Sequence, residues 1–168
     1  MRVNDVPGVW FFSLDAASRP AVELARRFWH LNYLVARFDI ERGHESWRYR
    51  MTRTDARGCR DGAPPPMLAC AWSRGRRLPP TEPDSLEHFL TERYALYTVR
   101  SGTVLRGRVA HVQWPLHEAN VDSIDETLIA AAGLERGPEA PLAMAAAPID
   151  VEGWGLERAW TTGGKGGR

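Results

Sequence analysis

The hydrophobic positions of this chain first repeat at helical spacing and then switch to alternation. Between residues 21 and 31, apolar side chains recur every three or four positions, at Leu24, Ala25, Phe28 and Leu31. This spacing predicts an amphipathic helix that turns one apolar stripe toward the core. Asp15 or Ser18 can cap its N-terminus, and Pro20 is tolerated in its first turn.

Strand patterns lie on both sides of this helix. The continuous apolar run 9–12 precedes it and predicts a short strand that is buried on both faces. After the helix, apolar and polar residues alternate over 34–40 and again over 47–52, with Gly43 and His44 between them. These two segments predict a β-hairpin with one apolar face and one arginine-bearing face.

Shorter patterns fill the rest of the chain, and proline and glycine mark the loops between them. Strands are predicted near 67–72, 94–99, 103–111, 119–124, 142–146 and 149–154. Short helices are predicted at 85–90 and 128–132, and the glycine-rich residues 159–168 are expected to form a disordered tail. The pattern therefore predicts one strand-rich α+β domain over residues 8–158, with two or three peripheral helices.

Composition and charge narrow the functional classes. The chain has 168 residues and a formal net charge of +1, without the basic excess that nucleic-acid or anionic-membrane binding requires. Its two cysteines do not form a disulfide framework, and neither a signal-peptide pattern nor a membrane-spanning apolar run is visible. We expect a cytoplasmic protein that binds no nucleic acid and no membrane.

Standard catalytic motifs are absent from the sequence. It contains neither a phosphate-binding glycine loop nor a nucleophile elbow. His88 and Glu92, four apart on a predicted helix, could hold a metal ion if His111 or a cysteine joined them. A local hydrogen bond is the simpler interpretation of this pair, so we expect no metal and no cofactor.

Arginines and tryptophans on the predicted strands allow two interpretations. Arginines alternate along both hairpins, at Arg48, Arg50, Arg53, Arg106 and Arg108. Together they could bind carboxylate or phosphate groups, although a solvated sheet face with ion pairs is the more common arrangement. Likewise, Trp47, Trp72 and Trp114 could line a ligand cavity or belong to the core.

Four groups of motifs, read in order, carry a family resemblance. They are residues 8–16 (GVWFFSLDA), 89–94 (FLTERY) with 96–98 (LYT), His111 with 114–116 (WPL), and 150–151 (DV) with Trp154. Together they resemble the YqjF-like family of domains of unknown function, which is placed in the acetoacetate-decarboxylase-like superfamily. The resemblance extends over residues 8–158.

The resemblance implies an antiparallel, cone-shaped β-barrel with a central cavity. Family members usually carry a further strand-rich segment before the GVWFF motif, where this chain has only residues 1–7. The resemblance therefore implies the C-terminal two-thirds of the domain and an incomplete barrel. Gly153 and Gly155 flank Trp154 where the family favours branched apolar residues and proline, which puts closure of the last strand in question.

The best-known activity of the superfamily uses a barrel lysine that forms a Schiff base with a β-keto acid. The only lysine here is Lys165, in the tail, so decarboxylation by that route is not expected. The first hypothesis is a barrel that binds a small organic ligand, with Arg93 neutralising an anion, Glu92 or His111 handling a proton, and Trp114 forming a wall. In the alternative interpretation, Glu92 and Arg93 simply pair and anchor the short helix.

A second hypothesis assigns the chain to another class, a non-catalytic interaction protein. A barrel that lacks consecutive strands exposes unpaired sheet edges, which favour strand addition by another chain or by a second copy. A third hypothesis, an enzyme that uses a metal, requires His88, Glu92 and His111 to converge.

Overall fold

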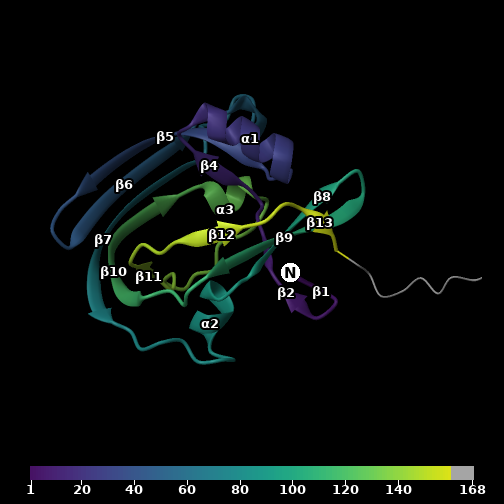
Figure 1. Ribbon diagram of the computed structural model, residues 1–168. Helices are drawn as coiled ribbons and strands as arrows, with labels where there is room; N and C mark the ends of the chain where they lie inside the picture. The colour runs from purple at the N-terminus through teal and green to yellow at the C-terminus, as the bar shows by residue number, and fades with distance from the viewer. Residues whose placement is uncertain (160–168) are drawn as a thin grey trace, which may run out of the picture.

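The computed structural model describes residues 1–159, which form two β-sheets with helices at their margins (Figure 1). The helices are α1 (Arg19–Trp29), α2 (Leu86–Thr91) and α3 (Leu128–Ala131), with one 3₁₀ turn, η1 (Ala56–Gly58). The strands are β1 (Arg2–Val3), β2 (Val6–Pro7), β3 (Val9–Trp10), β4 (Leu14–Ala16), β5 (Tyr33–Arg42), β6 (Ser46–Arg53), β7 (Met67–Arg77), β8 (Ala95–Arg100), β9 (Thr103–His111), β10 (Leu116–Glu126), β11 (Met144–Ala146), β12 (Val151–Gly153) and β13 (Glu157–Arg158).

The larger sheet has six strands in the order β11-β10-β7-β6-β5-β4. It curls into a half-barrel (Figure 1). All of its pairs are antiparallel except β4 with β5, which run parallel. The strand-rich α+β class predicted from the pattern is confirmed. The path of strands is open, and β4 and β11 form its two edges.

The hairpin predicted from the alternation over 34–40 and 47–52 is confirmed as β5 and β6. Its register places Phe38 opposite Met51 and therefore keeps the alternating apolar residues on one face. Across the next pair of strands Trp47 lies opposite Trp72, and the two rings stack with centroids 4.3 Å apart at 12°. This pair belongs to the half-barrel, whereas Trp114 lies in the β9–β10 connection and has the ring of His111 as its neighbour.

The second sheet has the order β12-β9-β8-β3, with β13 also beside β9. The predicted hairpin of β8 and β9 is confirmed, and its turn residues Ser101 and Gly102 both have positive φ, as a two-residue turn requires. The N-terminal strand β3 runs parallel to β8. Gly8 is required here, because a Cβ atom would lie 2.5 Å from the ring of Tyr97. The Tyr97 hydroxyl in turn donates to the carbonyl of Val6 at 3.0 Å.

The start of α1 agrees with the prediction, but its buried face does not. Ser18 caps the helix by accepting from the backbone N–H of Ala21 at 3.4 Å. The predicted apolar stripe is wrong, since the side chains of Leu24 and Phe28 are 53% and 57% exposed while Val22 is fully buried. The face toward the sheet also carries Arg26, whose guanidinium bonds the Tyr33 carbonyl and the Asp55 carboxylate. A hydrophobicity pattern treats every arginine as exposed to solvent, so it cannot predict a buried helix face that includes Arg26.

The apolar run at residues 9–12 is also less buried than predicted. Only Val9 and Trp10 form a strand, and that strand has β8 as its one neighbour. Trp10 is 38% exposed and Phe12 is 58% exposed. The prediction of a strand buried on both faces is therefore wrong, because Trp10 and Phe12 are exposed and Val9 and Phe11 are only half-buried.

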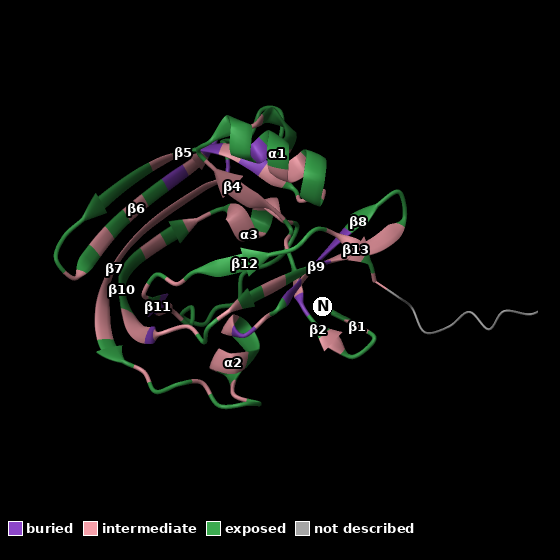
Figure 2. Ribbon diagram, in the orientation of Figure 1, coloured by how far each residue is buried: buried purple, intermediate pink, exposed green. Residues whose placement is uncertain are grey.

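The best-buried polar group of the half-barrel is an ion pair at the end covered by α1. The Arg53 guanidinium donates Nε and Nη2 to the two carboxylate oxygens of Asp15, each at 2.8 Å. It also bonds the Gly58 carbonyl at 3.2 Å and the Ser13 hydroxyl at 3.0 Å. The hydrogen bond with Asp15 raises the pKa of the Arg53 guanidinium. Figure 2 shows this corner as one of the places where buried residues gather.

Candidate functional site: a cleft beside α2

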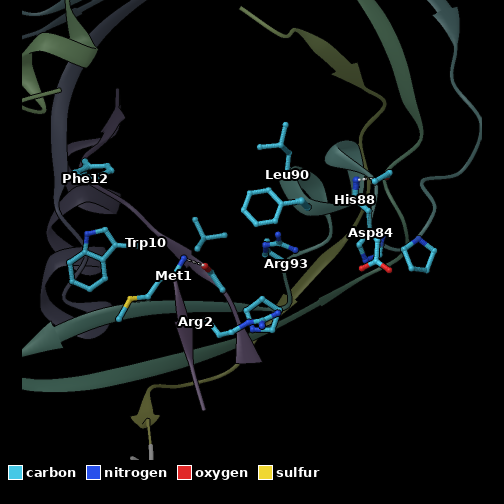
Figure 3. Close-up of a pocket in the computed structure, with 14 residues that line it drawn as sticks. Met1, Arg2, Trp10, Phe12, Asp84, His88, Leu90 and Arg93 are labelled. Carbon is cyan, nitrogen blue, oxygen red and sulfur yellow. Dashed lines mark hydrogen bonds between the residues drawn. The ribbon is translucent and has the colours of Figure 1, made fainter. Parts of the chain in front are cut away.

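A cleft of about 1060 Å³ lies between the N-terminal segment and α2 (Figure 3). Its volume lies just above the range of roughly 300–1,000 Å³ that is typical of small-molecule sites. The lining side chains come from these two walls, namely Met1, Arg2, Pro7, Gly8, Val9, Trp10 and Phe12 on one and Pro83, Asp84, Ser85, His88, Phe89, Leu90 and Arg93 on the other.

The first wall is held in place by the second sheet. The short hairpin of β1 and β2 turns at Asn4 and Asp5, both with positive φ, and β3 docks on β8. Trp10 and Phe12, which pattern analysis assigned to the core, instead line the cleft. The figure shows their rings on the side opposite Leu90 and Arg93 (Figure 3).

The second wall is α2 and the turn before it. Ser85 caps the helix by accepting from the backbone N–H of His88 at 3.1 Å, as predicted. The His88 Nδ1 atom lies 3.4 Å from the Thr81 hydroxyl, which also accepts from the side chain of Gln113 at 2.7 Å. The β9–β10 connection therefore braces this wall from behind.

Arg93 is the notable charge of the cleft. Its guanidinium carbon lies 4.3 Å from the centroid of the Phe89 ring, and Nη1 donates to the Glu92 carbonyl at 2.9 Å. Among residues 1–159 no carboxylate oxygen lies within 4.0 Å of the guanidinium nitrogens. A half-buried positive charge on an apolar wall thus has no carboxylate counter-ion in the part of the chain that the structure describes.

The Glu92 side chain belongs to a different cluster. It is 3% exposed, and its Oε2 atom accepts from the Tyr94 hydroxyl at 2.5 Å. Its Oε1 atom accepts from the backbone N–H of Trp114 at 3.3 Å and from the Thr91 hydroxyl at 3.4 Å. The hydrogen bond to the carboxylate is the main reason that the pKa of Tyr94 rises to about 12. Neutral donors from α2, from the residue before β8 and from the β9–β10 connection therefore hold a buried acid.

His111 and Trp114 join this cluster through their rings. The His111 ring stacks on Tyr94 with centroids 4.8 Å apart at 28°, and lies 5.3 Å from the ring of Trp114. The His111 Nδ1 atom lies 2.7 Å from the Val112 carbonyl oxygen. None of these three residues lines the cleft.

The structure thus divides the four candidates chosen from the sequence. Glu92, His111 and Trp114 come together with Tyr94, whereas Arg93 lies on the cleft wall. Glu92 and Arg93 do not pair through their side chains, since Arg93 contacts only the Glu92 backbone oxygen. The four side chains do not converge on one enclosed pocket.

The structure also places the arginine face and the metal-ligand candidates that the sequence suggested. The predicted arginine face is not a single site, because Arg53 is buried against Asp15 while Arg48 and Arg106 make ion pairs with Glu41 and Glu157. No group of three or more His, Cys, Asp or Glu side chains in residues 1–159 could hold a metal ion. Lys165 lies outside the described residues.

The aromatic lining of the cleft, formed in part by Trp10 and Phe12, was not predicted from the sequence. Trp10 and Phe12 sit in a continuous apolar run, which is also the pattern of a core strand. A usable signal was present on the other wall. Phe89 lies on α2 and Arg93 follows two residues after the helix ends, and this spacing of four can bring an arginine onto an aromatic ring.

The fold and the cleft define a strand-rich α+β protein with a curled sheet and an open, aromatic-lined cleft at one end. The chain belongs to the DUF2071 family, described as "Uncharacterized conserved protein", whose model matches residues 1–150. It is 35% identical over 155 residues to the "Uncharacterized protein YqjF" of Bacillus subtilis (strain 168). That match covers 92% of this chain but 61% of the relative, so the chain spans less than two thirds of its length. The predicted YqjF-like resemblance is confirmed.

No solved structure matches the chain. None of the helices in residues 1–159 is long and apolar enough to cross a membrane.

Proposed function

We propose that this protein binds a small organic ligand with an anionic group in the cleft between the N-terminal segment and α2. The proposal rests mainly on the environment of Arg93. Its guanidinium is half-buried, lies over the ring of Phe89 and has no carboxylate partner among residues 1–159. A cation in an apolar setting is costly to leave without a counter-charge, so an anionic ligand gains from meeting it.

The two walls support the same function. The apolar and aromatic residues Trp10, Phe12, Phe89 and Leu90 are between 38% and 63% exposed. Apolar surface that is concentrated in a concavity with a few polar groups is typical of ligand sites. Arg2, on the other wall, adds a second positive charge, and Asp84 is the acid among the lining residues.

The proposed function does not use Schiff-base chemistry. The lysine that such chemistry uses in the superfamily is present only as Lys165, outside the described residues, and the cleft contains no lysine. The proposal also takes the half-barrel as part of an acetoacetate-decarboxylase-like barrel. The family resemblance and the curl of the six-stranded sheet support that assignment.

Strand addition at an open sheet edge has less support. The edge strands β3, β4, β11 and β12 have two or three residues each. Such short edges offer few backbone groups to another chain, and shortness is a common protection of sheet edges. The cleft therefore remains the stronger candidate.

Titration with 1-anilinonaphthalene-8-sulfonate, an apolar anion whose fluorescence rises on burial, tests the proposed function. We expect one saturable site in the wild-type protein and at least fivefold weaker binding in Phe89→Ala. Phe28→Ala is the matched control, because Phe28 is similarly exposed but lies on α1, outside the cleft. Equal effects of the two substitutions would place the probe elsewhere and refute the proposal.

A further inference from the structure

We infer that the ligand of this cleft is an apolar monocarboxylate, an organic acid with one carboxylate and an extended hydrocarbon or aryl-alkyl body. This inference rests on the proposed function and adds the ligand class. It follows from three properties of the lining, which are the form of the cation, the small amount of charge, and the position of the apolar surface.

The cation favours a carboxylate. A guanidinium is planar and offers five N–H donors, and its fork matches the two oxygens of a carboxylate. In Arg93 the Nη1 atom donates a hydrogen bond to the Glu92 carbonyl, and the ring of Phe89 restricts the orientation of the guanidinium plane. The remaining edge is thus pre-oriented, which lowers the entropy that binding must remove.

The amount of charge favours a single negative group. The lining side chains supply Arg2 and Arg93 as cations and Asp84 as an acid, and the Met1 ammonium, which donates to the Gly8 carbonyl at 3.0 Å, adds a further positive charge. A dianion such as a phosphate monoester would meet the repulsion of Asp84 with its second charge. A ligand with one carboxylate can pair with Arg93 and leaves only apolar groups to face the rest of the lining.

The apolar surface favours a long body. Trp10 and Phe12 lie on the wall across from Phe89, Leu90 and Arg93 (Figure 3). A ligand anchored at Arg93 therefore has apolar side chains on both sides of its body. The volume of about 1060 Å³ accommodates far more than a two- or three-carbon acid. Each further buried methylene should tighten binding roughly fourfold.

Isothermal titration calorimetry on the full chain tests the ligand class with hexanoate, octanoate, 1-octanol and octylamine. Octanoate should bind at least tenfold tighter than 1-octanol, because a charge-assisted hydrogen bond is worth about that much. Octylamine should bind more weakly than 1-octanol, and hexanoate, which is two methylenes shorter, about 16-fold more weakly than octanoate.

Arg93→Met keeps a long side chain over Phe89 but removes the charge. It should reduce octanoate binding to the level of 1-octanol and leave 1-octanol unchanged. Arg93→Lys keeps the charge without the fork and should recover part of the preference. Arg100→Met is the matched control, since Arg100 is exposed at the end of β8 and does not line the cleft. It should leave both affinities unchanged.

Each outcome bears on one of the two proposals. If octanoate and 1-octanol bind equally, and Phe89→Ala weakens both, the cleft is a ligand site but the monocarboxylate inference is wrong. If no probe binds in a way that depends on Phe89, the proposed function is wrong as well. A dimer that excludes the probes, detected by sedimentation of the same samples, would assign the cleft to a second copy and overturn both.

Discussion

Two arginines, Arg53 under α1 and Arg93 beside α2, show how the same side chain serves two different regions. Arg53 is 3% exposed and has a carboxylate, a hydroxyl and a carbonyl as partners. Arg93 is half-buried, and its guanidinium contacts the backbone carbonyl of Glu92 and the ring of Phe89. Asp15 neutralises Arg53 within the fold, whereas no carboxylate among residues 1–159 pairs with Arg93.

The difference teaches that burial alone does not mark a functional arginine. The Arg53 guanidinium is the more buried of the two, but Asp15 neutralises it and its role is to join β4 to β6. A guanidinium that the fold orients without neutralising is the better candidate for binding. Four measurements test this contrast.

The largest effect is expected at Arg53. Arg53→Met leaves the Asp15 carboxylate buried without its cation, which should lower the free energy of unfolding by about 3–5 kcal/mol. Arg93→Met removes no ion pair and should cost less than about 1 kcal/mol. Urea denaturation of both variants measures the difference. Similar losses in the two variants would break the contrast between the regions.

The next effect concerns α1, the helix that covers the Arg53 corner. Val22→Ala should lower the free energy of unfolding by about 2 kcal/mol, because Val22 is fully buried and two methyl groups are lost. Phe28→Ala should cost less than about 0.5 kcal/mol, since that ring is largely in solvent. A greater loss for Phe28 than for Val22 would show that α1 packs through its other face.

A smaller, pH-dependent effect is expected at Tyr94, next to the cleft arginine in sequence. Tyr94→Phe removes the hydrogen bond to the buried Glu92 carboxylate, at a cost of about 1 kcal/mol for a side chain that is partly solvated. The folded-state pKa of Tyr94, about 12, lies above its ordinary value of 10.0. The stabilisation is therefore complete below pH 10 and is lost as the pH rises through 12.

Urea midpoints at pH 8, 10 and 11.5 measure this effect. The wild-type protein should lose more stability over that range than Tyr94→Phe, because the variant has no proton to release at this position. Parallel losses would mean that the Tyr94 hydroxyl is not coupled to Glu92.

The smallest effect is expected at Arg48. Its ion pair with Glu41 spans 3.5 Å, and the two side chains are 75% and 68% exposed. Arg48→Ala should change the free energy of unfolding by less than about 0.5 kcal/mol, because solvent screens such pairs. A loss above about 1 kcal/mol in urea denaturation would show that exposed arginines of this sheet also stabilise the fold.

Local sequence patterns predicted most of the helices and strands of this fold. The hairpins β5–β6 and β8–β9 and the caps at Ser18 and Ser85 follow from residues that are near one another in sequence. The buried face of α1 did not, because Arg26 points toward the sheet and is satisfied there by distant partners. A hydrophobicity pattern does not contain these partners, the Tyr33 carbonyl and the Asp55 carboxylate, and therefore predicts that Arg26 faces solvent.

The site was predictable only in part for a similar reason. Motif resemblance selected Glu92, Arg93, His111 and Trp114, but neighbouring residues on a chain can point to opposite sides. Glu92 turns to Tyr94 and Arg93 turns to Phe89. The role of Trp10 in the cleft depends on how β3 docks on β8, which is a long-range contact.

The docking of β3 on β8 has a consequence for the order in which the protein folds. Tyr97 and Val6, which share a hydrogen bond across this junction, are 91 residues apart in the sequence. Closing so long a loop is slow relative to forming the hairpins, so β3 should dock after the β8–β9 hairpin has formed. Segments held by few contacts also open most often without global unfolding. The amide protons of Val9 and Trp10 should therefore exchange faster than those within β5 and β6, and each opening would give ligands a route into the cleft.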